Sequence, residues 1–308
     1  MVSIRTPPGA DDNWVDTPSE EFNVTRVHET AVVSPDARLG VNVSIGAFSV
    51  IEAGTTLDDD CQIASHVVIK SGTSLGVNCE VAEGAVLGGR PQHLQAGNEV
   101  GRVDIGDHNV IREYVTIHRA LEPASVTQIG QHNLLMANSH VGHDCDLGDH
   151  IIVANNVMIA GHVVVDDCVY IAGAAGIHQF CRIGQYAMVG GQAHVTQDVP
   201  PFVMLDGITT KIVGLNQVGL RRSGFSPADL SDLKAAYRVV YREGLTWNET
   251  LAKLSKQFPD GPASEFYEFL VSSQRGVVQE RRTPRAATVR FPTNRIQRAV
   301  DLETRKAG

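Results

Sequence analysis

A short polar segment of this chain concentrates side chains that can move protons. His143 is followed directly by Asp144, and His140 lies three residues earlier. Gly161 and Gln179 continue from His143 in even steps of eighteen. A histidine that titrates near neutral pH can take the proton from a hydroxyl or amine while that group attacks a carbonyl carbon. This combination of residues therefore points to acyl transfer.

We assign the roles in that reaction as follows. His143 is expected to act as the general base, and Asp144 to accept a hydrogen bond from its second ring nitrogen and fix the tautomer. Gly161 has no side chain, so its backbone N–H can face the oxyanion of a tetrahedral intermediate. Such a donor typically contributes about 3 kcal/mol. The reaction requires no cofactor. Cys145 stays open as a nucleophile, because on a strand it would face the same side as His143.

The segment lies inside a six-residue repeat. Every sixth residue from Val27 to Val195 is Val, Ile or Leu at 26 of 29 positions. The three exceptions fall in two irregular stretches, which we expect to be loops: about 88–104 and 118–128.

A period of six predicts a parallel β-helix, since α-helices need apolar spacing near 3.6 and half-buried strands a spacing of 2. Three hexapeptides form one triangular coil, so positions eighteen apart stack at roughly 4.8 Å. His143, Gly161 and Gln179 should therefore form one column, with His162 and His178 on either side of it. Zinc-dependent carbonic anhydrases share this fold. The spacing from His140 to His143 does not match their paired ligands, so no metal site is predicted.

The chain divides into four parts. We expect an extension at 1–24, the β-helix at 25–200, a small helical domain at 201–280 and a basic, flexible tail at 281–308. Prolines at 200 and 201 cannot continue a strand ladder and should end the prism. Capping boxes predict helices from Ser226 to about Arg242 and from Thr246 to about Phe258, and a third helix should span about 262–275.

Composition limits the partners and the compartment. The net charge of -9 and the pI near 5.7 argue against nucleic-acid binding. No apolar run approaches the length of a membrane span, and the N-terminus lacks the layout of a signal peptide. The five cysteines show no CxxC spacing, which suits free thiols. Cys61 and Cys79 should line the core. We therefore expect a cytoplasmic protein.

Several motifs together resemble one family, the UDP-N-acetylglucosamine O-acyltransferases of lipid A biosynthesis. The resemblance runs from about 25 to 280 and rests on Asn133–Met136, His140–Cys145, Ala160–His162, His178–Phe180, Gln197–Pro201 and Gly219–Phe225. It implies a left-handed β-helix and a homotrimer with active sites between prisms. It also implies a 3-hydroxyacyl group delivered by acyl carrier protein and a UDP-sugar as acceptor, most simply the 3-hydroxyl of UDP-N-acetylglucosamine.

The resemblance carries roles to individual positions. It makes His143 the base, Asp144 its partner and Gly161 the oxyanion donor. Contacts to the sugar phosphate or to the acyl-pantetheine are implied for Gln92, His140, His162, His178 and Gln179, and contacts to the nucleotide for Asn216 and Arg222. His93 is expected to bind substrate at the position that faces the hexosamine. Gly191 falls where the family sets acyl length, and a glycine there suggests a longer chain.

Four positions depart from the family pattern. His93 replaces an Asp that touches the hexosamine, and Gln95 replaces a Lys. Val218 replaces a Glu near the ribose, and Ser223 replaces an Arg of the phosphate clamp. Losing one charge-assisted hydrogen bond of this kind typically costs about 1.5 to 3 kcal/mol.

Two alternatives to this function remain open. One is the same chemistry on an amino sugar or another nucleotide sugar, and the other is a non-catalytic binding or scaffold protein.

Overall fold

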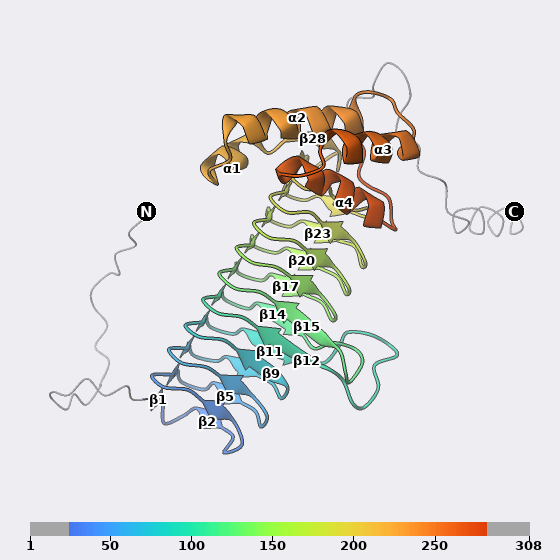
Figure 1. Cartoon of the computed structure of the whole chain (residues 1–308). Coiled ribbons are helices and arrows are strands. Elements are labelled where there is room, and N and C mark those ends of the chain that lie inside the picture. Colours follow the sequence, from blue (N-terminus) through green and yellow to red (C-terminus); the bar gives the residue numbers. More distant parts are fainter. Residues whose placement is uncertain (1–24, 282–308) are drawn as a thin grey trace, which may run out of the picture.

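The computed structural model describes residues 25–281, and the chain forms a three-sided prism with helices at its C-terminal end (Figure 1). Each side is a sheet of short strands in which every third strand of the chain is a neighbour. The expected extension at 1–24 and the tail from 282 onward lie outside the described residues.

The first side of the prism is an 11-stranded sheet. Its strands, in spatial order, are β1 (Arg26–Val27), β4 (Ser44–Ile45), β7 (Gln62–Ile63), β10 (Glu80–Val81), β13 (Val110–Ile111), β16 (Leu134–Leu135), β19 (Ile152–Val153), β22 (Tyr170–Ile171), β25 (Met188–Val189), β27 (Val203–Leu205) and β28 (Ile212–Leu215).

The second side has nine strands and the third has eight. The second contains β2 (Val32–Val33), β5 (Val50–Ile51), β8 (Val68–Ile69), β11 (Val86–Gly89), β14 (Thr116–His118), β17 (His140–Val141), β20 (Met158–Ile159), β23 (Gly176–Ile177) and β26 (His194–Val195). The third contains β3 (Arg38–Leu39), β6 (Thr56–Leu57), β9 (Thr73–Leu75), β12 (Arg102–Ile105), β15 (Val126–Ile129), β18 (Asp146–Leu147), β21 (Val164–Val165) and β24 (Arg182–Ile183).

The register of these sheets confirms the count in eighteens. His140 lies opposite Met158, and Met158 opposite Gly176. Glu80 instead pairs with Val110, because the first predicted loop adds two hexapeptides to that coil. The two loops project from the body of the prism near β11, β12 and β15 (Figure 1).

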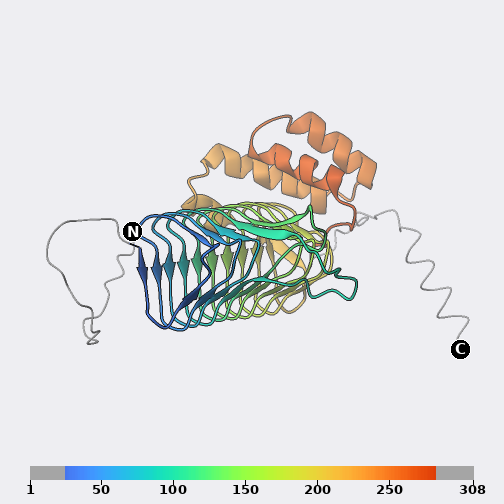
Figure 2. The same cartoon turned by 90° about the horizontal axis from the view of Figure 1, so that it is seen from below.

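The interior is filled by the residues that define the period. Val141, Ile159 and Ile177 are at most 2 % exposed, as are most aliphatic residues of that register. Burying one such side chain stabilises the fold by about 1.5–3 kcal/mol. Cys61 and Cys79 line the core as expected and carry free thiols. Successive coils lie side by side in the view from below (Figure 2).

The corners need residues that tolerate left-handed backbone. Twenty non-glycine residues in the described chain have positive φ, among them Asp144 at 57° and His162 at 59°. Asn, Asp and His occupy this region more readily than other side chains. Five histidines occupy corner positions with this left-handed backbone: His66, His108, His132, His150 and His162.

The prism continues past the prolines at which we expected it to end. β27 pairs in parallel with β25, Met204 lying opposite Met188, and β28 then pairs antiparallel with β27. The interval from Met188 to Met204 is shorter than the usual eighteen, because the chain crosses the last corner in a tighter turn. Both strands therefore belong to the first sheet, although they lie beyond position 200.

Up to residue 281, where the described part ends, four α-helices and one 3₁₀ turn follow: α1 (Gln217–Arg222), α2 (Pro227–Tyr241), α3 (Trp247–Gln257), η1 (Pro262–Ser264) and α4 (Glu265–Ser272). Both predicted capping boxes are present, at Ser226 and at Thr246. The third predicted helix is shorter than 262–275 and begins as the 3₁₀ turn, and α1 was not predicted as a helix. Figure 1 places these helices at the C-terminal end of the prism. None of the described helices combines the length and apolarity that crossing a bilayer requires.

Candidate active site

A groove of about 620 Å³ runs over the outer face of the second sheet, beside the loop of residues 90–101. Seven of the predicted site residues line it: Gln92, His93, His140, His143, Gly161, His178 and Gln179. Gln92 and His93 come from the loop, and the others from three consecutive coils. These seven residues, predicted to gather on one edge of the prism, thus line one concave surface.

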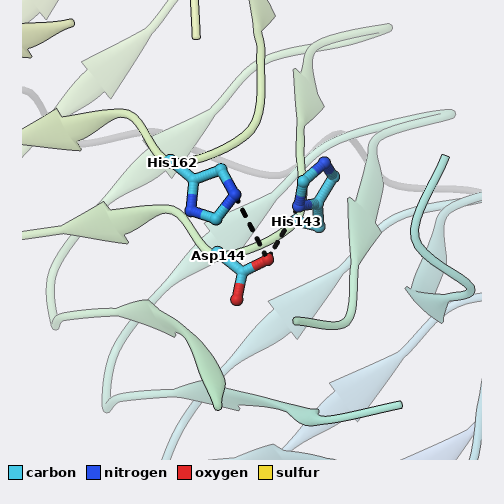
Figure 3. Close-up of side chains that lie close together, drawn as sticks. All are labelled: His143, Asp144 and His162. Carbon is cyan, nitrogen blue, oxygen red and sulfur yellow. Dashed lines mark hydrogen bonds and ion pairs between the residues drawn. The ribbon is translucent and has the colours of Figure 1, made fainter. Parts of the chain in front are cut away.

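The centre of the groove is an imidazole paired with a carboxylate. Nδ1 of His143 lies 2.7 Å from Oδ2 of Asp144, and the two side chains are only 10 % and 12 % exposed (Figure 3). A carboxylate at Nδ1 favours the tautomer that carries its proton there, which leaves Nε2 free to accept a proton.

The second insertion holds Asp144 in place. The backbone N–H of Leu121 donates to Oδ2 of Asp144 at 2.9 Å. The N–H of Asp144 donates in turn to the buried hydroxyl of Thr127 at 2.8 Å. The loop between β14 and β15 therefore holds the carboxylate through Leu121, and β15 holds the backbone of Asp144 through Thr127.

Gly161 stands directly against the free nitrogen of the imidazole. A Cβ added to Gly161 would lie 2.6 Å from Nε2 of His143, so any side chain there would collide with the ring. No described residue accepts a hydrogen bond from the Gly161 amide. A backbone donor without a protein partner is thus available beside the proton-accepting nitrogen.

His162 approaches the same pair from the next coil. Its ring meets the ring of His143 edge to face, with centroids 5.0 Å apart, and stacks on Phe180 at 4.6 Å. Nε2 of His162 lies 3.9 Å from Oδ2 of Asp144 (Figure 3). Burial lowers the pKa of His162, and positive charge on His143 or His93 would lower it further, against the opposing effect of Asp144. The neutral ring is therefore favoured.

His140 forms a second polar point on the groove floor. Its Nδ1 lies 2.9 Å from the Thr116 hydroxyl, and its ring lies 5.1 Å from that of His118. Burial, with smaller contributions from His118 and His143, lowers the pKa of His140 to about 4. At neutral pH this imidazole is uncharged and can hydrogen-bond a polar ligand without attracting counterions.

Cys145 is not positioned to be a nucleophile. Its thiol is fully buried in the core and donates to the carbonyl of Ala160 at 3.1 Å. Burial raises the pKa of this thiol to about 12. Because its side chain points into the core, Cys145 cannot serve as the nucleophile that the sequence left open.

Three of the predicted residues lie away from this groove. Asn216 caps α1, and its amide is occupied at both ends by the Gly219 N–H and the Tyr186 carbonyl. Arg222 is exposed at the end of α1, and Gly191 is exposed near the last coils. Within one chain none of them lines the groove that contains His143.

Other groove residues were missed by sequence reasoning. His118, Met158, Gly176 and His194 all line the groove. Three of them follow His140 in steps of eighteen and lie on the outer face of β20, β23 and β26. The same count, started from His140 instead of His143, would have found them.

Two family models match parts of this chain. The family model described as UDP N-acetylglucosamine O-acyltransferase, domain 2, matches residues 198–278. The model for the bacterial transferase hexapeptide repeat matches residues 127–161.

Full-length relatives match over most of the chain. The acyl-[acyl-carrier-protein]–UDP-N-acetylglucosamine O-acyltransferase of Thiobacillus denitrificans is 44% identical over 82% of this chain and 99% of its own length. The enzyme of that name from Burkholderia lata is 39% identical over 83% and 100%. The crystal structure of the Francisella novicida UDP-N-acetylglucosamine acyltransferase matches with a TM-score of 0.82 at 32% identity, covering 86% of this chain and 99% of that one. The prism is left-handed, as the resemblance implied. This chain is thus an enzyme that belongs to the UDP-N-acetylglucosamine O-acyltransferase family.

Proposed function

We propose that this protein transfers a 3-hydroxyacyl group from acyl carrier protein to the 3-hydroxyl of UDP-N-acetylglucosamine, the first step of lipid A synthesis. The observation that carries the proposal is the arrangement around His143: a carboxylate at Nδ1, and an unpartnered backbone amide in the residue that packs against Nε2. Relatives at 39–44% identity carry the corresponding name.

The reaction can be followed through this chain's own groups. Nε2 of His143 takes the proton of the sugar hydroxyl as its oxygen attacks the thioester carbonyl carbon. The carbonyl π electrons move to oxygen, and the Gly161 N–H donates to the resulting oxyanion. The intermediate then expels the pantetheine sulfur, which receives the proton from His143. Asp144 stabilises the imidazolium that exists between these two transfers.

The groove supplies room for an acyl-pantetheine chain. Its floor is one outward column in which Met158 and Gly176 separate two histidines, His140 and His194. A Cβ added to Gly176 would touch nothing within 4 Å, so the groove is open at that point. This supports an extended, mainly apolar ligand with a few fixed polar contacts.

A homotrimer would complete the site. Asn216, Arg222 and Gly191 were expected to contact the nucleotide or the acyl end, yet they do not line the groove of their own chain. We propose that a neighbouring prism supplies them, so that each site contains residues of two subunits.

The cysteines bear on the compartment of this reaction. Their thiols are free, and four of them are buried, which fits the reducing cytoplasm.

The position of His93 favours a second candidate acceptor, an amino sugar. Its ring packs edge-on against His143 at 5.5 Å, and its Nδ1 accepts the Gln95 N–H at 3.2 Å. A neutral His93 then carries its proton on Nε2 and presents a donor where the family pattern has a carboxylate acceptor. A panel of UDP-sugars, including one with an amine at carbon 3, tests this second candidate. Equal or higher kcat/KM for the amino sugar would favour it over UDP-N-acetylglucosamine.

The decisive experiment for the main proposal is His143→Ala. Transfer from 3-hydroxyacyl carrier protein to UDP-N-acetylglucosamine should fall by at least about 1,000-fold, in the range expected when a general base is lost. Gel filtration and thermal unfolding should match the parent protein. A variant with parental turnover would remove His143 from the mechanism. A parent protein inactive with 3-hydroxyacyl carrier protein and UDP-N-acetylglucosamine would overturn the proposed reaction.

A further inference from the structure

The cluster of His143, Asp144 and His162 has a second chemical capability. Each residue offers one ligand atom, and these three atoms all lie within 4.8 Å of one another (Figure 3). The carboxylate oxygen is 2.7 Å from Nδ1 of His143 and 3.9 Å from Nε2 of His162. Two imidazole nitrogens and one carboxylate oxygen form a ligand set that Zn²⁺ favours in sites with one open position.

The separations are close to those that a tetrahedral ion needs. Zinc binds nitrogen and oxygen at about 2.0–2.2 Å, which puts neighbouring ligand atoms roughly 3.3 Å apart. The two distances to the carboxylate oxygen lie on either side of that value. The two ring nitrogens lie within 4.8 Å of each other. Binding therefore requires both imidazoles to turn, Nδ1 of His143 away from the carboxylate oxygen and Nε2 of His162 toward it.

The cluster is also held in place before any ion arrives. Oδ2 of Asp144 is oriented by the Leu121 N–H at 2.9 Å. The ring of His162 is sandwiched between Phe180 and the edge of His143. Such outer contacts reduce the ordering that binding requires and typically change metal affinity about 10- to 100-fold.

We infer that His143, Asp144 and His162 form an inhibitory binding site for one Zn²⁺ or a similar divalent transition-metal ion per chain. The inhibitory part of this inference rests on the proposed function, in which Nε2 of His143 is the base. An ion bound through Nδ1 displaces the proton that this nitrogen shares with Asp144. In the neutral ring that proton moves by way of solvent to Nε2, and no net proton is lost. Nε2 then carries hydrogen and cannot accept one from the sugar hydroxyl.

Binding is measured on the full chain by titration with Zn²⁺, and by the visible absorption of Co²⁺ in the same site. The parent protein should take up one tight ion per chain. His162→Gln keeps the pair of His143 and Asp144 intact but removes one ligand, and it should weaken binding by about 100-fold or more. Asp144→Asn should have a comparable effect.

A matched control comes from a second group of histidines. His108, His132 and His150 stack at a different corner with centroids 4.7 and 4.9 Å apart. His132→Gln removes the middle ring and should leave the tight site unchanged. A loss of tight binding in this control, or its persistence in His162→Gln, would place the ion elsewhere and overturn the inference.

Two further measurements keep the test independent of how the variants fold. X-ray absorption of the zinc-loaded parent should show two imidazole nitrogens and a carboxylate oxygen, and any other ligand set contradicts the site. Zn²⁺ should inhibit acyl transfer at the concentration at which it binds, and a chelator should restore turnover. Full activity with the site loaded would refute the inhibitory role. Because stoichiometry and ligand set do not depend on turnover, a failure of the proposed acyl transfer would leave them measurable.

Discussion

The backbone amide of Asp144 donates to the hydroxyl of Thr127 at 2.8 Å and joins two successive coils directly behind His143. Asp144 sits in left-handed backbone at φ 57°, a conformation that a residue with a side chain adopts at some cost. The Thr127 hydroxyl holds the backbone of Asp144 in this conformation and so helps to position its carboxylate beside His143. It is a positioning residue and not a catalytic one.

Thr127→Val removes that acceptor while keeping the shape of the side chain. The buried Asp144 amide would lose its partner, at a cost of about 1–3 kcal/mol. We expect kcat to fall about tenfold with little change in KM, and Thr127→Ser to restore it. Steady-state kinetics with the acyl carrier protein substrate measures kcat and KM separately for both variants. A valine variant with lower thermal stability but unchanged kcat would mean that the contact serves folding alone.

Gly161→Ala should reduce turnover by about 100- to 1,000-fold. The new Cβ would lie 2.6 Å from Nε2 of His143, so the ring must leave its place against the Gly161 backbone or lose its bond to Asp144. Gly173→Ala is the matched control, since the nearest atom to its Cβ is 3.3 Å away and belongs to Asn155. Similar kcat values for the two variants would argue against a special role for Gly161.

Cys145→Ala should keep at least about half of the parental kcat, because the thiol faces the core and its pKa is raised to about 12. Removing the buried sulfur should lower thermal stability, by about 1 kcal/mol if the cavity stays open. Mass spectrometry after incubation with acyl donor should show no acyl group on this residue. An acylated Cys145, or loss of turnover in a folded variant, would revive it as the nucleophile.

His140 should make the fold sensitive to mild acid. Its pKa is about 4 in the folded protein, against an ordinary value of 6.5. Between these values the unfolded chain binds a proton that the folded chain does not, so stability is complete above pH 6.5 and declines as pH falls toward 4. Thermal unfolding at pH 7 and pH 5 should show a smaller decrease for His140→Asn than for the parent. Parallel decreases would show that other groups cause the loss.

The sequence by itself determined the coil and the column of active residues. A strict period of six leaves one way to bury Val141, Ile159 and Ile177 together, and the positions that stack on one another then follow by counting in eighteens. The hydrogen bond between His143 and Asp144 was also predictable, because the two residues are neighbours in the sequence and their side chains can meet at a corner.

Tertiary structure decided what lies outside that period. The contact of Leu121 with Asp144 comes from an irregular loop, whose path no repeat specifies. The inward direction of Cys145 depends on the corner at Asp144, which interrupts the alternation assumed for a strand. The extension of the sheet to Leu215 depends on a last turn that is shorter than the others. Periodicity fixes only residues that share a register, whereas loops and chain ends are placed by packing against distant parts of the molecule.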